Sequence, residues 1–219
     1  MNSLSIHISG TEFLLHPLRA IYWPAQKTLI CSDVHIGKAE HFRKSGIEMP
    51  RLVNKNNFWN LSVLFELYKP ERWLVLGDLM HSTVNSEWYD LTDFLANYPS
   101  IHVHLIRGNH ELYPDQTYLD LGFEVSESLI SGDLLFTHEE ESRSQNLFNI
   151  HGHIHPAVRL RGAAGQSLRL PCFYKSETKF ILPAFGAFTG SFTVKPKRTD
   201  RVFVIAENKV MEISPAVNT

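Results

Sequence analysis

The sequence predicts an α/β fold in which two β-sheets pack together and helices cover the outside. Three observations support this prediction: strand-like and helix-like segments alternate in the first half of the chain, short strand-like segments follow one another in the second half, and polar residues stand directly after several strands. A strand–helix–strand order favours parallel strands with helices packed on the sheet. Short strands separated by turns favour antiparallel pairing.

The first half of the chain carries the alternating segments. Two apolar stretches around Ser9-Gly10 are typical of a short hairpin. Three mainly apolar segments that are typical of buried strands come later, and the segments between them place apolar residues at mixed three- and four-residue spacing, which is typical of helices. We expect strands at 4–8, 12–16, 28–34, 73–76 and 101–106, and helices at 51–68 and 86–97.

The second half changes character. Its apolar segments are short, turns separate them, and few helical patterns occur. This arrangement predicts a mostly antiparallel part that packs on the parallel part. We expect strands there at 124–128, 133–137, 157–161, 167–174, 179–182 and 201–206.

Composition is typical of one globular domain. The chain has 219 residues, 43% of them apolar, and no repeat or linker divides it, so we expect a single domain over residues 1–219. Cys31 and Cys172 are expected to be free, mostly buried thiols, since paired structural thiols are rare in a reducing cytoplasm. The N-terminus lacks the basic-then-apolar pattern of a signal peptide, and no apolar run approaches the roughly 18 residues of a membrane span. We therefore expect a soluble cytoplasmic protein.

The net charge of −2 excludes a global attraction to nucleic acid, so polyanion binding would need a local basic surface. One basic stretch contains Lys38, Arg43, Lys44, Arg51 and Lys55, and another contains Lys195, Lys197, Arg198 and Arg201. For the second stretch a solvated loop is the favoured interpretation. Three phenylalanines among glycines could stack on a base, although core packing is favoured for them: Phe185, Phe188 and Phe192.

Polar side chains follow the ends of the predicted strands. In open α/β sheets, ligand sites form beyond the carboxyl ends of parallel strands, so residues after three consecutive strands would meet at one edge. Two later apolar runs also end in histidines. The side chains concerned are Asp33, His35, Asp78, Asn109, His110, His138, His153 and His155.

The residue types in this set indicate a metal centre. Carboxylates and imidazoles without thiolates suit Mn²⁺, Fe or Zn²⁺ rather than a structural zinc site. Asp33 and His35 are two residues apart and can converge on one ion, and His153 and His155 repeat that spacing. A carboxylate such as Asp78 can bridge two ions about 3.5–4 Å apart, the separation used for phosphoryl displacement.

The ordered blocks Asp33-x-His35, Gly77-Asp78, Gly108-Asn109-His110, His138 and Gly152-His153-x-His155 resemble the calcineurin-like metallophosphoesterases over about residues 33–155. The resemblance implies a four-layer α/β/β/α sandwich of two mixed sheets flanked by helices. It also implies two divalent ions, first Mn²⁺, with Fe, Zn²⁺ or Mg²⁺ as alternatives. One ion would be bound by Asp33, His35, Asp78 and His155, and the other by Asp78, Asn109, His138 and His153. His151 stays an alternative to His138.

The same resemblance implies a mechanism. A hydroxide bridging the two ions would attack phosphorus in line with the leaving oxygen, and His110 would protonate that oxygen as the general acid. Family members often carry Asp after this histidine, whereas this chain has Glu111, so the partner of His110 stays open. His81 either contacts the substrate or caps the turn after Asp78. Candidate substrate-binding residues are Lys38, His41, Arg43 and His81.

A narrower resemblance covers nearly the whole chain. Segments 33–47, 77–82, 168–173 and 182–190 are similar to the bacterial DNA-ligase-associated metallophosphoesterases. This similarity implies a DNA-damage-response endonuclease or phosphodiesterase with DNA as substrate and a DNA ligase and a helicase as partners. Two alternatives remain: a phosphoesterase of a nucleotide or nucleotide-linked lipid precursor, and a non-catalytic scaffold subunit. The lack of a clear amphipathic basic helix speaks against the lipid substrate, and the complete ligand set speaks against the scaffold.

Overall fold

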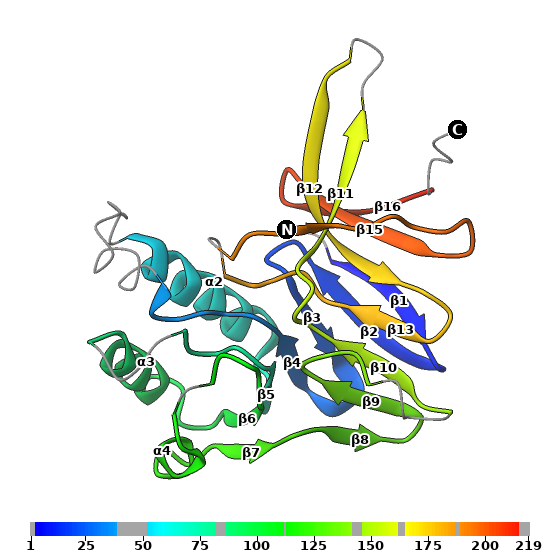
Figure 1. The fold of residues 1–219 in the computed structure, drawn as a ribbon. Helices are drawn as coiled ribbons and strands as arrows, with labels where there is room; N and C mark the ends of the chain where they lie inside the picture. Colours follow the sequence, from blue (N-terminus) through cyan, green and yellow to red (C-terminus); the bar gives the residue numbers. More distant parts are fainter. Residues whose placement is uncertain are drawn as a thin grey trace.

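The computed structural model describes residues 3–38, 52–81, 86–111, 113–141, 146–161, 165–186 and 189–214. These residues form two mixed β-sheets that pack on each other, with the α-helices beside the first sheet (Figure 1). Within these ranges, no helix is long and apolar enough to cross a membrane. Cys31 and Cys172 are both buried and free, as predicted.

The first sheet has seven strands in sequence order. Pairing is antiparallel from β1 to β4 and parallel from β4 to β7, and helices α2 and α3 make the crossovers that parallel strands require. The elements are β1 (Leu4–Ile8), β2 (Thr11–His16), β3 (Ala20–Trp23), the 3₁₀ turn η1 (Pro24–Gln26), β4 (Thr28–Cys31), α2 (Leu52–Tyr68), β5 (Arg72–Leu76), α3 (Ser86–Ala96), β6 (His102–Ile106), α4 (Asp115–Leu119) and β7 (Glu124–Ser126).

The second sheet holds nine strands in the order β14-β11-β12-β13-β10-β9-β8, and β15 and β16 extend it from β12. Strands β9, β10 and β13 are parallel at its centre, while most of the other pairs are antiparallel. Its strands are β8 (Leu129–Ser131), β9 (Leu134–Thr137), β10 (Phe148–His151), β11 (Pro156–Arg161), β12 (Ser167–Lys175), β13 (Lys179–Ile181), β14 (Phe192–Thr193), β15 (Arg201–Ala206) and β16 (Lys209–Ile213).

Side-chain alternation along the central strands builds two cores. In β5, Trp73 and Val75 pack against the helices, whereas Leu74 and Leu76 face the second sheet. Because successive residues of a strand point to opposite faces, a continuous apolar run fills both cores at once. This explains why the buried strands carry unbroken apolar runs, and it confirms the predicted pair of packed sheets with parallel strands in the first.

Several predicted boundaries were wrong at their ends. The strand predicted at 28–34 stops at Cys31, and the strand predicted at 124–128 stops at Ser126. Seven elements had no prediction: β3, η1, α4, β8, β10, β14 and β16. These elements are short, and their own residues show too few periods to indicate a strand or a helix.

Candidate metal centre

The loops after β4 and β5 continue the pairing of these strands beyond their ends. Asp33 N donates a hydrogen bond to Gly77 O at 3.0 Å, and His35 N donates to Asp78 O at 2.9 Å. The two loops are therefore held side by side. As predicted, Asp33, His35 and Asp78 meet at one edge of the first sheet.

The backbone is left-handed at five of the seven proposed ligands. A positive φ is uncommon for residues other than glycine, although Asp, Asn and His tolerate it best. Such conformations cluster at functional sites because they aim side chains that regular strands would point elsewhere. The φ angles are 55° at Asp33, 50° at His35, 53° at Asp78, 65° at His153 and 52° at His155.

Asp33, His35 and His155 form the first group of donor atoms, which lie within 4.8 Å of one another. His155 Nε2 lies 3.0 Å from Asp33 Oδ1, and His35 Nε2 lies 3.5 Å from Asp78 Oδ2. Asp33 Oδ1 and His35 Nε2 are buried, and within the described ranges neither makes a hydrogen bond of good geometry. Buried polar atoms without partners are costly, so a cation placed among them would stabilise the arrangement.

Asp78, Asn109, His138 and His153 form the second group. His138 Nε2 lies 3.5 Å from Asp78 Oδ1, 3.3 Å from Asn109 Oδ1 and 3.2 Å from His153 Nδ1. Asp78 takes part in both groups, with Oδ2 toward His35 and Oδ1 toward His138. This is the position that a carboxylate bridging two ions needs.

Backbone carbonyls fix the orientation of two imidazoles. His138 Nδ1 donates to Leu76 O at 2.9 Å, and His155 Nδ1 donates to Thr189 O at 3.1 Å. Nδ1 of each ring is thereby engaged, and Nε2 points into the donor groups, as in many metal sites where a carbonyl holds the far nitrogen. The residues present therefore fit a pair of divalent ions.

The electrostatics of the centre also favour cations. Burial lowers the pKa of His35 to about 2, so its ring is neutral and one of its nitrogens carries a lone pair. Burial raises the pKa of the Asp78 carboxyl. For Asp33, burial acts in the same direction, but the nearby imidazoles of His155 and His138, when protonated, outweigh it and lower the pKa of this carboxyl. Two cations would favour the ionised form of both carboxyls.

Two glycines let other site residues approach the backbone. A Cβ at Gly77, whose φ is 77°, would lie closer than 3.0 Å to three atoms of the His138 side chain. A Cβ at Gly108 would lie equally close to the backbone N and Oδ1 of Asp78. Glycine at these positions is therefore a packing requirement of the centre.

The geometry favours His138 over His151 as the isolated histidine. His138 belongs to the second donor group, whereas His151 is fully buried and its Nδ1 donates to the neighbouring Gly152 carbonyl at 3.1 Å. Burial lowers the pKa of His151 to about 4, which keeps that ring neutral. We therefore interpret His151 as a structural residue behind the centre.

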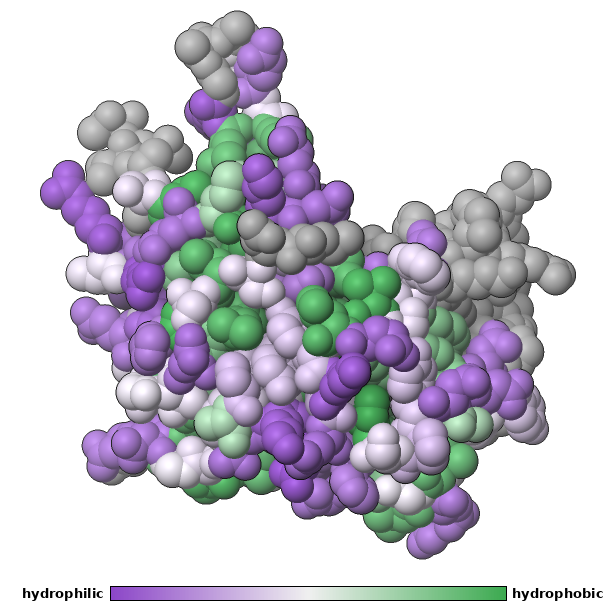
Figure 2. Space-filling view, turned by 180° about the vertical axis from the view of Figure 1, so that it is seen from behind, coloured by the Kyte–Doolittle hydropathy of each residue, from purple (hydrophilic) through white to green (hydrophobic). Residues whose placement is uncertain are grey.

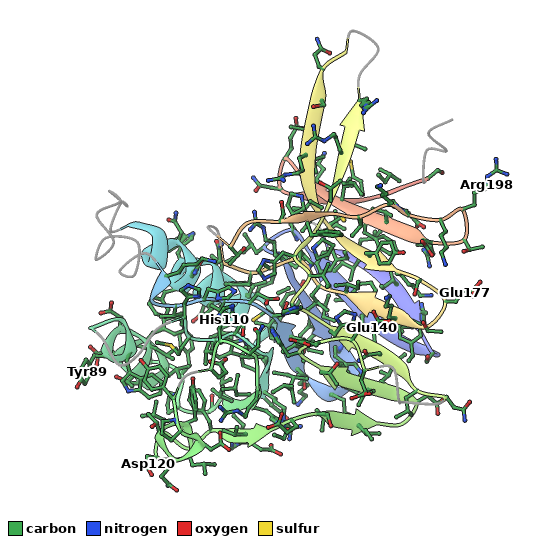
Figure 3. All side chains as sticks on the ribbon, viewed as in Figure 1. Tyr89, His110, Asp120, Glu140, Glu177 and Arg198 are labelled. Atoms are coloured by element: carbon green, nitrogen blue, oxygen red, sulfur yellow. The ribbon has the colours of Figure 1, made fainter. Side chains whose placement is uncertain are left out.

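His110 lies at the open edge of the centre, where the strand ends meet (Figure 3). Its side chain is exposed, and its ring centroid lies 5.7 Å from that of His35. Its backbone N donates to Asp78 Oδ1 at 3.0 Å. The described part of the chain places His110 in neither donor group. This position beside the ligands, open to solvent, suits a proton donor better than a ligand.

The predicted substrate-binding residues are only partly described. His81 Nδ1 lies 3.1 Å from His35 Nδ1, and the His81 ring is 5.2 Å from that of His110. Lys38 is half-buried; burial lowers the pKa of its amine, while the charges of Asp78 and Asp33 oppose this. Both residues thus border the centre. His41, Arg43, Lys44, Arg51 and Phe188 lie outside the described ranges, as does the side chain of Lys55.

Glu111 has a role that the sequence did not indicate. Its carboxylate accepts hydrogen bonds from Leu79 N at 2.6 Å and from Tyr118 Oη at 3.0 Å, so it holds the backbone directly after Asp78. It faces this loop, and no hydrogen bond to His110 occurs among the described residues. Burial raises the pKa of Glu111 to about 7. Its position after the Asn109-His110 pair was the only sequence signal for this role.

The acidic segment 139–141 reaches the metal centre through its first residue. Glu139 Oε1 lies 3.7 Å from His153 Nδ1, and Glu139 forms a further donor group with His138 and His153. Glu139 directly follows His138 in the sequence, and this adjacency could have suggested the contact.

Two other expectations can be judged directly. In the second basic stretch, Arg201 pairs with Glu212 at 2.7 Å, and Figure 3 shows Arg198 far from His110. The favoured solvated-loop interpretation thus agrees with the structure for Lys195, Lys197 and Arg198, whereas Arg201 is the first residue of β15. Phe185 is buried in the core, whereas Phe192 is 63% exposed and its backbone N donates to His155 O. Core packing therefore holds for Phe185 but was wrong for Phe192.

A sheet edge that gathers carboxylates and imidazoles is typical of hydrolases that act on phosphate esters with bound divalent ions. The family model for calcineurin-like phosphoesterases matches residues 26–177, and the chain belongs to this family of metallophosphoesterases. The predicted fold class of two mixed sheets with flanking helices is thereby confirmed.

Two solved structures illustrate the similarity. Nuclease MPE of Pseudomonas putida shares 29% sequence identity with the chain, and the match covers 97% of this chain and 100% of that one with a TM-score of 0.83. Phosphoesterase Yfce of E. coli shares 14% identity over 86% of this chain and 98% of that one, with a TM-score of 0.43. A comparison with curated proteins found no match.

Proposed function

We propose that the chain is a two-metal phosphodiesterase that cleaves DNA. One observation carries the chemistry: seven donor side chains from the strand ends of both sheets converge in two groups that share Asp78. The similarity to a nuclease over nearly the whole chain supports a nucleic acid as the substrate.

The residues divide the work as follows. With two divalent ions bound, Mn²⁺ first among them, the centre would supply an activated water and positive charge beside the phosphate. Asn109, which is exposed next to His138, orients toward the phosphate oxygens and stabilises their growing charge. His110 protonates the leaving oxygen from the open edge. Lys38 and His81 border the same edge and position the phosphate.

The biological setting is part of the same proposal. We infer a role in DNA repair with a DNA ligase and a helicase as partners, and a cytoplasmic location. The similarity of segments 168–173 and 182–190 to the ligase-associated group supports this setting. An endonuclease would cut a circular single-stranded DNA into linear products, whereas an enzyme that needs a free end would leave the circle intact.

The direct test is hydrolysis of bis-p-nitrophenyl phosphate by protein that has been chelated and then reloaded with Mn²⁺. Asp78→Asn removes the carboxylate shared by both groups, so activity and bound manganese should both fall by more than tenfold. Asp133→Asn is the matched control, since Asp133 is exposed and lies in neither donor group. If folded wild-type protein hydrolysed no phosphoester with any metal, the scaffold interpretation would replace this proposal.

A further inference from the structure

Strands β11 and β12 form a hairpin that stands out from the body of the molecule (Figure 1), and we call residues 156–161 with 165–171 the arm. The arm begins directly after His155, one of the proposed ligands. Its base is held by pairing of β12 with β13 and β15, while Ser167–Pro171 pair only with β11. In the view from behind, hydrophilic residues lie near its outer end (Figure 2).

The arm is strongly basic in a chain that is not. The segment 156–171 contains three arginines, no lysine and neither Asp nor Glu, which gives a formal charge of +3, whereas the whole chain carries −2. Cross-strand register places the three arginines on one face, because Arg159 pairs with Arg169 and Arg161 pairs with Ser167.

These arginines have no acidic partner. All three are exposed, and within the described ranges no ion pair joins any of them to a carboxylate. Arg159 and Arg169 lie directly opposite each other, and like charges in this position destabilise a strand pair. Local arrangements that oppose folding are expected at functional positions. An anion lying along this face would neutralise the repulsion between the two guanidinium groups.

The arginine face leads into a hollow beside the metal centre. This arginine hollow has a volume of about 230 Å³, and its lining includes Arg19, Arg169, His155 and Ser191. Arg19 Nη1 donates to Ala184 O and to Gly186 O, both at 3.3 Å, so its side chain is held in place. The hollow thus offers two guanidinium groups next to His155, and guanidinium groups bind phosphate well.

The hollow on the other side of the centre has the opposite character. It borders Asn109 and His138 and has a volume of about 460 Å³, with four glutamates and one arginine in its lining. These acidic side chains repel phosphate. Charge therefore favours the arginine side as the path by which a polyanion reaches the ligands. The side chains are Glu127, Glu139, Glu140, Glu141 and Arg107.

We propose that the arm and the arginine hollow form a track that binds the backbone of a single strand of nucleic acid and leads it to the His155 side of the centre. Arg159 and Arg161 are two residues apart, about 6.6 Å along the strand, so they can contact different phosphates. The arginine hollow is smaller than a typical small-molecule pocket, which excludes a duplex from it. This proposal rests on the proposed function, because a nuclease must bind its substrate strand, but strand binding can be measured without catalysis.

The test is the affinity of a fluorescent single-stranded DNA 20-mer for the full-length protein in chelator, measured by anisotropy over a range of salt concentrations. In the triple variant Arg159→Gln, Arg161→Gln, Arg169→Gln, the dissociation constant should rise between roughly tenfold and a hundredfold at 0.1 M salt, and the slope of log K against log salt should fall by about 2. Its melting temperature should stay the same or rise, because the Arg159–Arg169 repulsion is gone.

The matched control removes three exposed cations that line neither hollow: Lys197→Gln, Arg198→Gln, Lys209→Gln. It should bind within about twofold of the wild type. Equal losses in both triple variants, or no loss in the arm variant, would overturn the track. An RNA 20-mer of the same length serves as a second ligand. Whichever of the DNA and the RNA binds more tightly to the wild type, and more weakly to the arm variant, is the nucleic acid that the track holds.

The two proposals fail in different ways. Wild-type protein that binds the strand through the arm but hydrolyses no phosphodiester would overturn the proposed function and keep the track. Manganese-dependent hydrolysis together with unchanged binding by the arm variant would overturn the track alone.

Discussion

Substituting Gly77 by alanine tests how tightly His138 is packed at the centre. Alanine at a φ of 77° carries a strain of about 1–2 kcal/mol. Its Cβ would also displace the His138 ring, because three ring or side-chain atoms lie closer than 3.0 Å to it. This displacement breaks the 2.9 Å hydrogen bond from His138 Nδ1 to Leu76 O, and a buried unsatisfied group costs about 1–3 kcal/mol. Overpacking adds about 1–3 kcal/mol.

Gly10→Ala provides the matched control. Gly10 has a φ of 78°, and a Cβ there would meet no atom within 4 Å, so this variant carries the strain without the crowding. Urea unfolding of the chelated proteins, followed by circular dichroism, should show Gly77→Ala less stable than Gly10→Ala by about 2–6 kcal/mol. In melting temperature this difference is on the order of 10 °C for a domain of this size. If the two variants differed by less than about 0.5 kcal/mol, the described packing of His138 would be wrong.

Two further predictions concern histidines. His16 is fully buried, and burial lowers its pKa to about 4, below the value near 6.5 in the unfolded chain. The contribution of His16 to stability is therefore complete above pH 6.5 and is lost as the pH falls toward 4. In unfolding curves recorded from pH 7 to 4, His16→Asn should reduce this loss of stability by about 3 kcal/mol, whereas the same change at exposed His7 should not. His110→Ala should lower the rate of cleavage of an oligonucleotide, which has a poor leaving group, by about 10²–10⁴-fold. Hydrolysis of bis-p-nitrophenyl phosphate should fall less, and the manganese content should stay unchanged. Loss of manganese would mean that His110 is a ligand.

The fold could be predicted where the sequence pattern and the tertiary environment agree. Strand β5 is buried on both faces, and the unbroken apolar run from Trp73 to Leu76 indicated this. Strand β3 is also buried, but its four residues stand between a turn and Pro24 and show too few periods. The predicted strand at 28–34 ran too far, because nothing in the residue types of Asp33 and His35 reveals that their backbone turns left-handed after Cys31.

The candidate site was predictable to a similar degree. The order of the motifs indicated all seven proposed ligands, because metal coordination restricts the ligands to a few side-chain types: carboxylate, amide and imidazole. The contact of Glu139 with His153 and the buried role of Glu111 depend on the paths of loops that no short pattern specifies. The arginines of the arm escaped notice because they are interleaved with apolar residues, and only the strand register gathers them on one face.

At five proposed ligands, the left-handed backbone favours other residue types than the carboxylates and imidazoles that metal binding requires. At a strain of about 1–2 kcal/mol each, these positions together oppose folding by an amount comparable with the whole stability of a typical domain. Selection for folding alone would favour glycine or asparagine at every one of them. Attempts to improve the thermostability of this protein by relaxing its backbone would therefore converge on the residues that the chemistry needs, and stability would be gained at the expense of metal binding.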